Sequence, residues 1–286
     1  MTATVPRACV MGHPVSHSRS PMIHGYWLKA LGIPGSYELQ DLSPEAFPAF
    51  VEGFAKNGFV GGNVTVPHKE VAFKMARRRD AAAEAIGAVN VLWLEDGVLV
   101  GGNSDVHGFI ANLDHTAPGW DVKNGRAVVL GAGGSARSAA YGLAKRGLEV
   151  ALVNRTVARA QELAAHFGKD FPGKISAHGW EDLAELLPRA DLLVNCTSCG
   201  MVGKPRLEID LDQLKLAAVV YDVVYVPLET ELLANAKARG HRIVDGLGML
   251  LEQAGFGFEK WFGAMPEVTA ELRAMLEADI RAKTPK

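Results

Sequence analysis

The chain has 286 residues, a length typical of two domains or of one large domain. Its 30 Lys and Arg residues nearly balance 32 Asp and Glu residues, which argues against nucleic acid as a partner because phosphate binding needs clustered positive charge. Three cysteines, a start without an apolar leader and the lack of any apolar run of about 18 residues predict a cytoplasmic protein without a membrane partner.

The first part of the chain alternates short apolar runs with longer periodic ones, a pattern typical of α/β proteins with largely parallel sheets. We expect a strand over 7–12 and then a helix over 20–32, with Ser20 as its N-cap. Further strands are expected near 36–39, within 58–67 and on both sides of Asp96-Gly97, and further helices over 46–56 and 68–79. Arg77-Arg78-Arg79 would form a solvated last turn of the helix over 68–79, where the helix dipole favours positive charge.

The second part follows a stretch, 114–125, that lacks apolar periodicity and is rich in turn residues. We expect a loop there, at or just inside a domain boundary. Beyond it, strands are expected at 126–130, 149–155, 191–198 and 218–225, and helices over 134–147 and 157–168. The segment 268–280 has one apolar face and should form a helix that docks on one of the domains.

A glycine-rich turn, Gly131-Ala132-Gly133-Gly134-Ser135-Ala136, lies directly between a predicted strand and a predicted helix. Its spacing is that of the dinucleotide-binding turn, in which the backbone approaches a pyrophosphate at the positive end of the helix dipole. A tight turn without a ligand is the alternative. The strand–turn–helix context favours a nucleotide site.

The tip of the next strand indicates which dinucleotide would bind. It carries Asn154, Arg155, Thr156 and Arg159, and it lacks the carboxylate that holds the ribose 2′-hydroxyl of NAD. Two guanidinium groups and a hydroxyl suit a 2′-phosphate, so the sequence favours NADP over NAD. The alternative is a solvated helix start, although positive charge is unfavourable at that end of a helix.

A candidate acid–base group follows the strand within 58–67. Asn63 and Thr65 should share one strand face, and Lys69 opens the next helix, where the dipole disfavours its charged form. General acid–base catalysis needs a pKa lowered in this way, although a lone lysine is most often a solvated surface residue. Asp105, at the end of a later strand, would pair with Lys69 if the two strand ends are neighbours.

Other polar residues offer ligand contacts. Asn90 could reach the same crevice, or it could be a left-handed helix cap. Ser18 and Ser20 precede a helix and suit a substrate carboxylate, although a simple N-cap explains Ser20 equally well. Cys196 and Cys199 have redox-motif spacing, but they follow a predicted strand and have no second Cys or His pair nearby, so we expect no metal site.

Taken together, an ordered set of short motifs resembles the shikimate dehydrogenase family, from residue 8 to about 262. The motifs are HSRSP (17–21), NVTVPHK (63–69), GAVN (87–90), GNSD (102–105), GAGGSAR (131–137), NRTVAR (154–159), NCTSCGM (195–201), YDVVY (221–225) and DGLGMLLEQA (245–254). Each is modest alone, but their common order is highly specific.

The resemblance implies an NADP-dependent oxidoreductase of aromatic amino acid biosynthesis, which reversibly reduces 3-dehydroshikimate to shikimate. It implies that Lys69 and Asp105 form the acid–base pair. The substrate-binding residues would be Ser18, Ser20, Asn63, Thr65, Asn90, Tyr225 and Gln253. The cofactor-binding residues would be Gly131, Ala132, Gly133, Gly134, Ser135, Asn154, Arg155, Thr156 and Arg159, with Val223 and Gly246 beside the nicotinamide.

The family also implies a domain arrangement. An N-terminal α/β substrate domain would comprise 1–106 and 247–286, and a Rossmann-like, doubly wound parallel sheet would comprise 107–246. The C-terminal helix would pack back on the first domain, and the protein would be a monomer or homodimer. Ser104 and Val223 depart from the usual family residues, while position 199 is variable in the family.

Two other functions fit much of the sequence. A quinate/shikimate dehydrogenase would share nearly every motif but accept a broader substrate or use NAD, which the tip around Arg155 disfavours. A non-enzymatic regulator that senses NADPH would have no need for Lys69 and Asp105.

Overall fold

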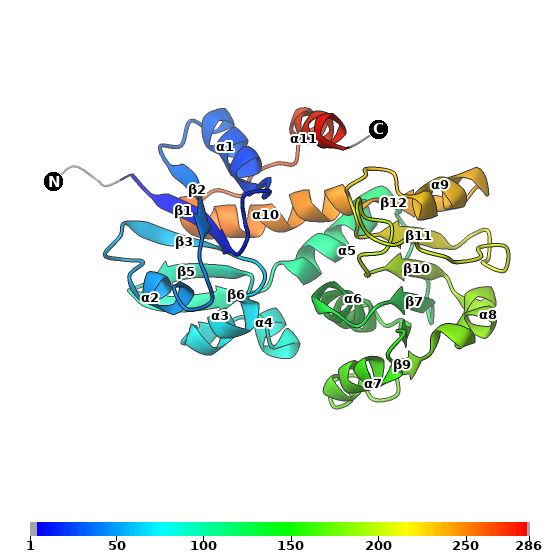
Figure 1. The fold of residues 1–286 in the computed structure, drawn as a ribbon. Coiled ribbons are helices and arrows are strands. Elements are labelled where there is room, and N and C mark those ends of the chain that lie inside the picture. Colours follow the sequence, from blue (N-terminus) through cyan, green and yellow to red (C-terminus); the bar gives the residue numbers. More distant parts are fainter. Residues whose placement is uncertain (1–4, 285–286) are drawn as a thin grey trace. The chain divides into compact units, whose positions relative to one another are not determined.

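The computed structural model describes residues 5–284, and these residues form two compact units. The first unit contains the chain up to Asp105 together with Leu251–Leu276. The second unit contains Val106–Leu250 and the chain from Glu277 onward (Figure 1). The first unit is therefore built from two separate segments, and most of the second unit lies between them in the sequence.

The first unit is built on a six-stranded mixed sheet with the order β2-β1-β3-β5-β6-β4. Its central strand β3 is parallel to β1 and antiparallel to β5, which is in turn antiparallel to β6. The strands are β1 (Arg7–Gly12), β2 (Ser36–Asp41), β3 (Phe59–Val64), β4 (Arg78–Arg79), β5 (Val91–Glu95) and β6 (Val98–Gly102). The helices are α1 (Ser20–Ala30), α2 (Phe47–Glu52), α3 (Lys69–Met75) and α4 (Ala81–Ile86), joined by part of α10 (Gly246–Phe262).

Strand alternation divides the core of this unit between the two faces of the sheet. Cys9 and Met11 of β1 pack with Phe47 of α2 and Ala72 of α3, so these short helices cover one face. On the other face, Ala8 packs in a cluster with Trp261 of α10, and the ring of Trp27 from α1 lies against the same helix.

The second unit is built on a six-stranded sheet that is parallel throughout, with the order β12-β11-β10-β7-β8-β9. This is the doubly wound order expected from the sequence. The strands are β7 (Arg126–Leu130), β8 (Glu149–Val153), β9 (Ile175–His178), β10 (Leu192–Asn195), β11 (Val219–Asp222) and β12 (Arg242–Val244). The helices include α5 (Asp105–Thr116), α6 (Gly134–Lys145), α7 (Val157–His166), α8 (Leu183–Leu186) and α9 (Glu231–Ala238). The last helix, α11 (Ala270–Lys283), is divided between the two units at Leu276.

Two clusters of buried apolar residues stabilise this unit. One joins α5, α6 and α7 to the sheet through residues such as Phe109 and Leu143. The other joins α8 and α9 to it through residues such as Leu183 and Leu233. Helices therefore cover both faces, which explains why the strands are almost continuously apolar.

Three sequence-based expectations about elements were wrong. The helix expected over 68–79 ends at Met75, and Arg78-Arg79 instead forms β4, which pairs with β6. The Arg79 guanidinium donates to the carbonyls of Phe73 and Ala76, so it caps the helix end rather than extending the helix.

The two other errors concern helix length. The helix expected over 46–56 ends at Glu52, and α5 continues to Thr116, inside the stretch expected as a loop. In α11, the apolar face predicted within 268–280 is confirmed, since Leu272, Leu276 and Ile280 are fully buried. None of the helices between residues 5 and 284 has the length and hydrophobicity that a membrane crossing requires.

Candidate active site

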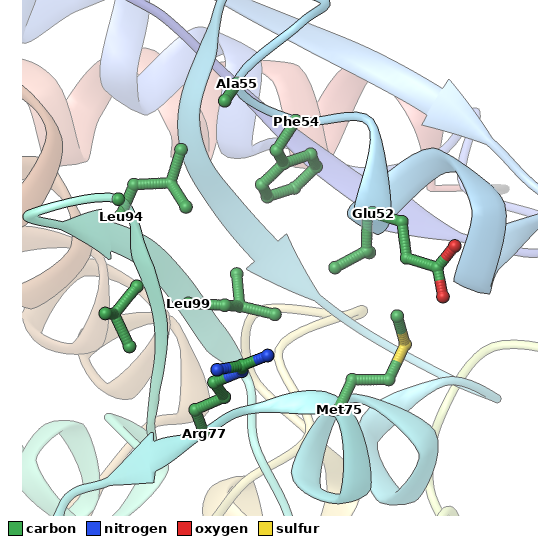
Figure 2. Close-up of a pocket in the computed structure, with 10 residues that line it drawn as sticks. Glu52, Phe54, Ala55, Met75, Arg77, Leu94 and Leu99 are labelled. Carbon is green, nitrogen blue, oxygen red and sulfur yellow. The ribbon is translucent and has the colours of Figure 1, made fainter.

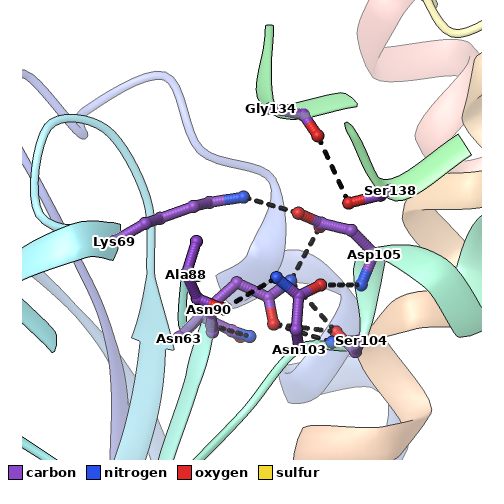
Figure 3. A network of polar contacts seen from close by, with 9 residues as sticks. All are labelled: Asn63, Lys69, Ala88, Asn90, Asn103, Ser104, Asp105, Gly134 and Ser138. Atoms are coloured by element: carbon purple, nitrogen blue, oxygen red, sulfur yellow. Dashed lines mark hydrogen bonds and ion pairs between the residues drawn. The ribbon is translucent and has the colours of Figure 1, made fainter. Parts of the chain in front are cut away.

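A lysine and a carboxylate form the centre of the candidate site, as Figure 3 shows. Lys69 Nζ lies 2.7 Å from Asp105 Oδ2, so the pairing expected from the sequence is confirmed. The side chain of Lys69 is 30% exposed and that of Asp105 is 13% exposed. The ammonium is therefore held in a defined position but is still open to solvent and to a ligand.

The strand order explains why two residues distant in sequence meet. Lys69 follows β3, Asp105 follows β6, and β5 lies antiparallel between these two strands. The carboxyl ends of β3 and β6 consequently lie at the same edge of the sheet, where β5 begins. The Lys69 carbonyl accepts a hydrogen bond from the N–H of Val89, which ties the start of α3 to the segment entering β5.

Asparagine side chains hold the carboxylate. Asn90 Nδ2 donates to Asp105 Oδ1 over 2.7 Å, and its Oδ1 accepts from the N–H of Ser104. Asn103 Oδ1 accepts from the N–H of Asp105, and Asn103 Nδ2 donates to the carbonyl of Ala88. The left-handed cap considered for Asn90 is wrong, because Gly87 occupies that position at φ 71° and Asn90 enters β5. Asp105 is therefore rigidly oriented toward Lys69.

The two predicted serines lie at the start of α1. The expectation that Ser20 is the N-cap was wrong, because Arg19 occupies that position and Ser20 is already helical. Ser18 Oγ instead accepts from the N–H of Ser20 and lies 3.2 Å from its hydroxyl. Both serines are half-buried, and their hydroxyls lie side by side at the start of α1, where they suit an anion. The first N–H groups of α1 are already used, since those of Met22 and Ile23 donate to the Arg19 carbonyl.

One residue at the site was missed by the sequence analysis. The Tyr37 hydroxyl donates to Asn63 Oδ1 over 2.6 Å, and Asn63 Nδ2 in turn donates to the carbonyl of Asn90. Tyr37 stacks on His24, whose ring centroid is 4.1 Å away, and burial lowers the pKa of His24 to about 3. The imidazole is therefore neutral at physiological pH. No local pattern in β2 distinguishes Tyr37 from an ordinary strand tyrosine.

Three further residues predicted to bind substrate are Thr65 and Gln253 in the first unit and Tyr225 in the second. Thr65 directly follows β3 and is half-buried, and its N–H donates to the carbonyl of Met11. Gln253 lies in α10, and its Oε1 is buried without a hydrogen-bond partner among residues 5–284. An unsatisfied buried amide oxygen is costly, so it fits a position that a polar ligand completes. Tyr225 is half-buried and belongs to the second unit.

A separate pocket of about 550 Å³ lies elsewhere in the first unit, between α2, α3 and the β5–β6 hairpin (Figure 2). It has an apolar floor, and the charged groups of Glu52 and Arg77 border it. Its lining residues are Val51, Glu52, Phe54, Ala55, Met75, Arg77, Leu94, Gly97, Val98 and Leu99. None of them belongs to the Lys69–Asp105 network, so this pocket is separate from the candidate site.

The glycine-rich turn in the second unit has the geometry of a dinucleotide site. Gly131 has φ 107°, and a Cβ there would lie 3.2 Å from the carbonyl oxygen of Cys196, so glycine is required. α6 follows with Gly133 as its N-cap and no side-chain hydrogen bond to its first N–H groups. Gly133 and Gly134 are exposed and Ser135 is half-buried, which leaves this helix start open to a pyrophosphate.

The tip of β8 is equally open. Asn154 Nδ2 donates to the carbonyl of Thr156, which shapes the turn into α7. Arg155, Thr156 and Arg159 are exposed. Within residues 5–284 neither guanidinium forms an ion pair, and Thr156 makes no capping bond to α7. Two unpaired positive charges at the start of a helix fit a bound phosphate.

Family models match most of the chain. One, described as the shikimate dehydrogenase substrate binding domain, matches residues 10–92. Another, described as shikimate / quinate 5-dehydrogenase, matches residues 114–224. A relative from Mesorhizobium japonicum, named shikimate dehydrogenase (NADP(+)), is 57% identical over 99% of this chain and 100% of its own length. The chain belongs to the shikimate dehydrogenase family.

Solved structures of this family share the fold. Shikimate 5-dehydrogenase from Thermus thermophilus, in complex with NADP(H) and shikimate, has a TM-score of 0.82 at 36% identity and covers 96% of this chain and 98% of its own. Quinate dehydrogenase from Corynebacterium glutamicum, in complex with NAD, has a TM-score of 0.88 at 28% identity, covering 95% and 99%. The fold alone therefore does not separate shikimate from quinate within the family, and the residues at the site must do so.

The remaining motifs of the second unit contain a buried carboxylate and two cysteines. The carboxylate of Asp222 is buried and accepts hydrogen bonds from Asn195 Nδ2, from the N–H of Val224 and from the Thr230 hydroxyl. Burial raises the pKa of Asp222 to about 6. Cys196 and Cys199 are free thiols, and within residues 5–284 no group of His, Cys, Asp and Glu is arranged to hold a metal.

Proposed function

We propose that this protein is an NADP-dependent shikimate dehydrogenase, which reversibly reduces 3-dehydroshikimate to shikimate in aromatic amino acid biosynthesis. The observation that carries the proposal is the Lys69–Asp105 ion pair, 2.7 Å long, in a chain that also carries an NADP-type strand tip. The 57% identity to a relative named for this reaction and cofactor supports it.

In the reduction, bound NADPH supplies a hydride to the carbonyl carbon of the substrate. Lys69 donates a proton to the carbonyl oxygen, so that the carbonyl becomes a hydroxyl. Asp105 holds the ammonium in place and accepts hydrogen bonds from the substrate. In the oxidation of shikimate the same lysine accepts the hydroxyl proton, as reversibility requires.

The substrate is held by polar groups on several elements. Its carboxylate binds Ser18 and Ser20, assisted by Tyr225. Its ring hydroxyls bind a set of side chains that includes the buried, unpaired amide oxygen of Gln253. The other members of this set are Asn63, Thr65, Asn90 and Asp105.

The second unit holds the cofactor. The backbone of Gly131–Ser135 binds the pyrophosphate, and Asn154, Arg155, Thr156 and Arg159 bind the adenosine phosphate. Val223 and Gly246 line the nicotinamide side. The open start of α6 supports the pyrophosphate site, and the unpaired guanidinium groups of Arg155 and Arg159 support the site of the adenosine phosphate. The protein acts in the cytosol, which its three free thiols support.

A spectrophotometric comparison of shikimate and quinate with NADP+ and NAD+ tests the function. We expect the highest kcat/KM with shikimate and NADP+. A preference for quinate or for NAD+ would favour the quinate/shikimate alternative. An absence of turnover with every pair, together with tight NADPH binding, would instead favour a regulator.

Replacing Ser18 with alanine should mainly weaken substrate binding. We expect KM for shikimate to rise about tenfold, because one hydrogen bond to a charged group is lost, while kcat changes little. Ser16, the neighbouring exposed serine, provides the matched control: Ser16→Ala should leave KM unchanged. A Ser18→Ala enzyme with normal KM for shikimate would remove Ser18 from the carboxylate site.

A further inference from the structure

Asp222 is a buried carboxylate that the reaction itself does not use. It lies at the end of β11, and its residue is 1% exposed. Its Oδ1 accepts from Asn195 Nδ2 over 2.9 Å and from the N–H of Val224 over 3.0 Å. Its Oδ2 accepts from the Thr230 hydroxyl over 2.6 Å. These bonds join the end of β10, the loop after β11 and the start of α9 at a single side chain.

Asn195 extends this network to the neighbouring loop. Its Nδ2 also donates to the carbonyl of Cys199, and its Oδ1 accepts from the N–H and the hydroxyl of Thr197. The amide group of Asn195 thus uses both donors and both lone pairs. A buried polar network in which the members are satisfied fixes one conformation, so the loops after β10 and β11 are held in a single arrangement.

The loop held in this way contains the residues proposed to contact nicotinamide and substrate. The N–H of Val223 donates to the carbonyl of Asn195, directly beside the Asp222 network. A Cβ on Gly246 would lie 2.2 Å from the carbonyl oxygen of Val223, so the start of α10 packs against this loop backbone. Tyr225 follows one residue after Val224, whose N–H Asp222 binds.

We propose that Asp222 and Thr230 are positioning residues, which hold the Val223–Tyr225 loop where the nicotinamide and the substrate carboxylate bind. This inference rests on the proposed function, because the loop faces those groups only if NADP and shikimate bind as described above. Neither residue touches the reacting atoms. Their effect on turnover is transmitted through the backbone of the loop.

The test uses Thr230→Val, which removes the hydroxyl that binds Asp222 while keeping the volume of the side chain. Two ligands are compared: NADPH, and 2′-phospho-ADP-ribose, which is the same molecule without nicotinamide. We expect the Kd for NADPH to rise and kcat for shikimate to fall, each about tenfold, since a small misplacement of a reacting group is costly. The Kd for 2′-phospho-ADP-ribose should stay unchanged.

Two further variants serve as controls. Thr230→Ser keeps the hydroxyl and should restore kcat and NADPH binding. The Thr230 hydroxyl also caps α9, because it accepts from the N–H of Leu233. Thr269→Val removes a comparable capping hydroxyl, which accepts from the N–H of Leu272 at the start of α11 but has no bond to the loop. Its kinetics should match those of the natural protein, which separates the loss of a helix cap from the loss of loop positioning.

An equal loss of affinity for both ligands in Thr230→Val would overturn the inference, because it would indicate general damage to the unit. Unchanged NADPH binding and kcat would overturn it as well. If Thr230→Val does not fold, Thr230→Ala replaces it, because it also removes the hydroxyl that binds Asp222 Oδ2. The same two outcomes then decide. If the unsubstituted protein binds NADPH but does not oxidise shikimate, the proposed function is wrong. The comparison of NADPH with 2′-phospho-ADP-ribose would still test whether Asp222 and Thr230 position the loop.

Discussion

Lys69→Ala is expected to lower kcat for shikimate oxidation by about two to four orders of magnitude, the usual contribution of a positioned acid–base group. In this variant Asp105 keeps its hydrogen bond from Asn90, but no group remains at Nζ to exchange a proton with the substrate. Steady-state kinetics with NADP+ measure the effect. The Kd for NADPH should be unchanged, since the proposed cofactor residues lie in the other unit.

Lys74 provides a matched control, because it is an exposed lysine at the other end of α3. Lys74→Ala removes the same charge from the same helix and should leave kcat unchanged. If Lys69→Ala retained nearly normal turnover, Lys69 would have no part in proton transfer, and the proposed mechanism would fail.

The second large effect concerns the choice of cofactor. Replacing Arg155 and Arg159 together with alanine should lower kcat/KM for NADPH by about two orders of magnitude, because two charge-assisted contacts to the phosphate disappear. The value for NADH, which has no 2′-phosphate, should change little. The ratio of the two values therefore isolates the phosphate contribution from any effect on the fold.

Arg189→Ala controls for the loss of an exposed arginine, since Arg189 lies on the surface of the same unit and is distant in sequence from the β8 tip. It should leave both values unchanged. An equal decrease with NADPH and NADH in the double variant would contradict the assignment of Arg155 and Arg159 to the 2′-phosphate.

Much of the second unit could be predicted from sequence because its signals are local. A strand, a glycine-rich turn and a helix follow one another directly, and Gly131 is required by its positive φ and its close approach to the Cys196 carbonyl. The charged tip around Arg155 is also readable from a few consecutive residues. The parallel sheet order then follows from the regular alternation of strands and helices.

The candidate site in the first unit depends on contacts that local patterns do not encode. Lys69 and Asp105 are separated by 36 positions, and only the antiparallel insertion of β5 between β3 and β6 brings them together. Tyr37 was missed because its role depends on Asn63, which lies on a strand two places away in the sheet. The three arginines at 77–79 were placed in a helix because charge patterning alone does not reveal that Arg78 and Arg79 pair with β6.

The division of the chain has a practical consequence for dissection of the protein. A fragment that stops at Asp105 would lack Trp261, whose indole N–H donates to the carbonyl of Leu92, and Phe258, which packs against Trp27. Truncation at Asp105 therefore removes part of the hydrophobic core of the first unit, so we expect that the fragment does not fold on its own.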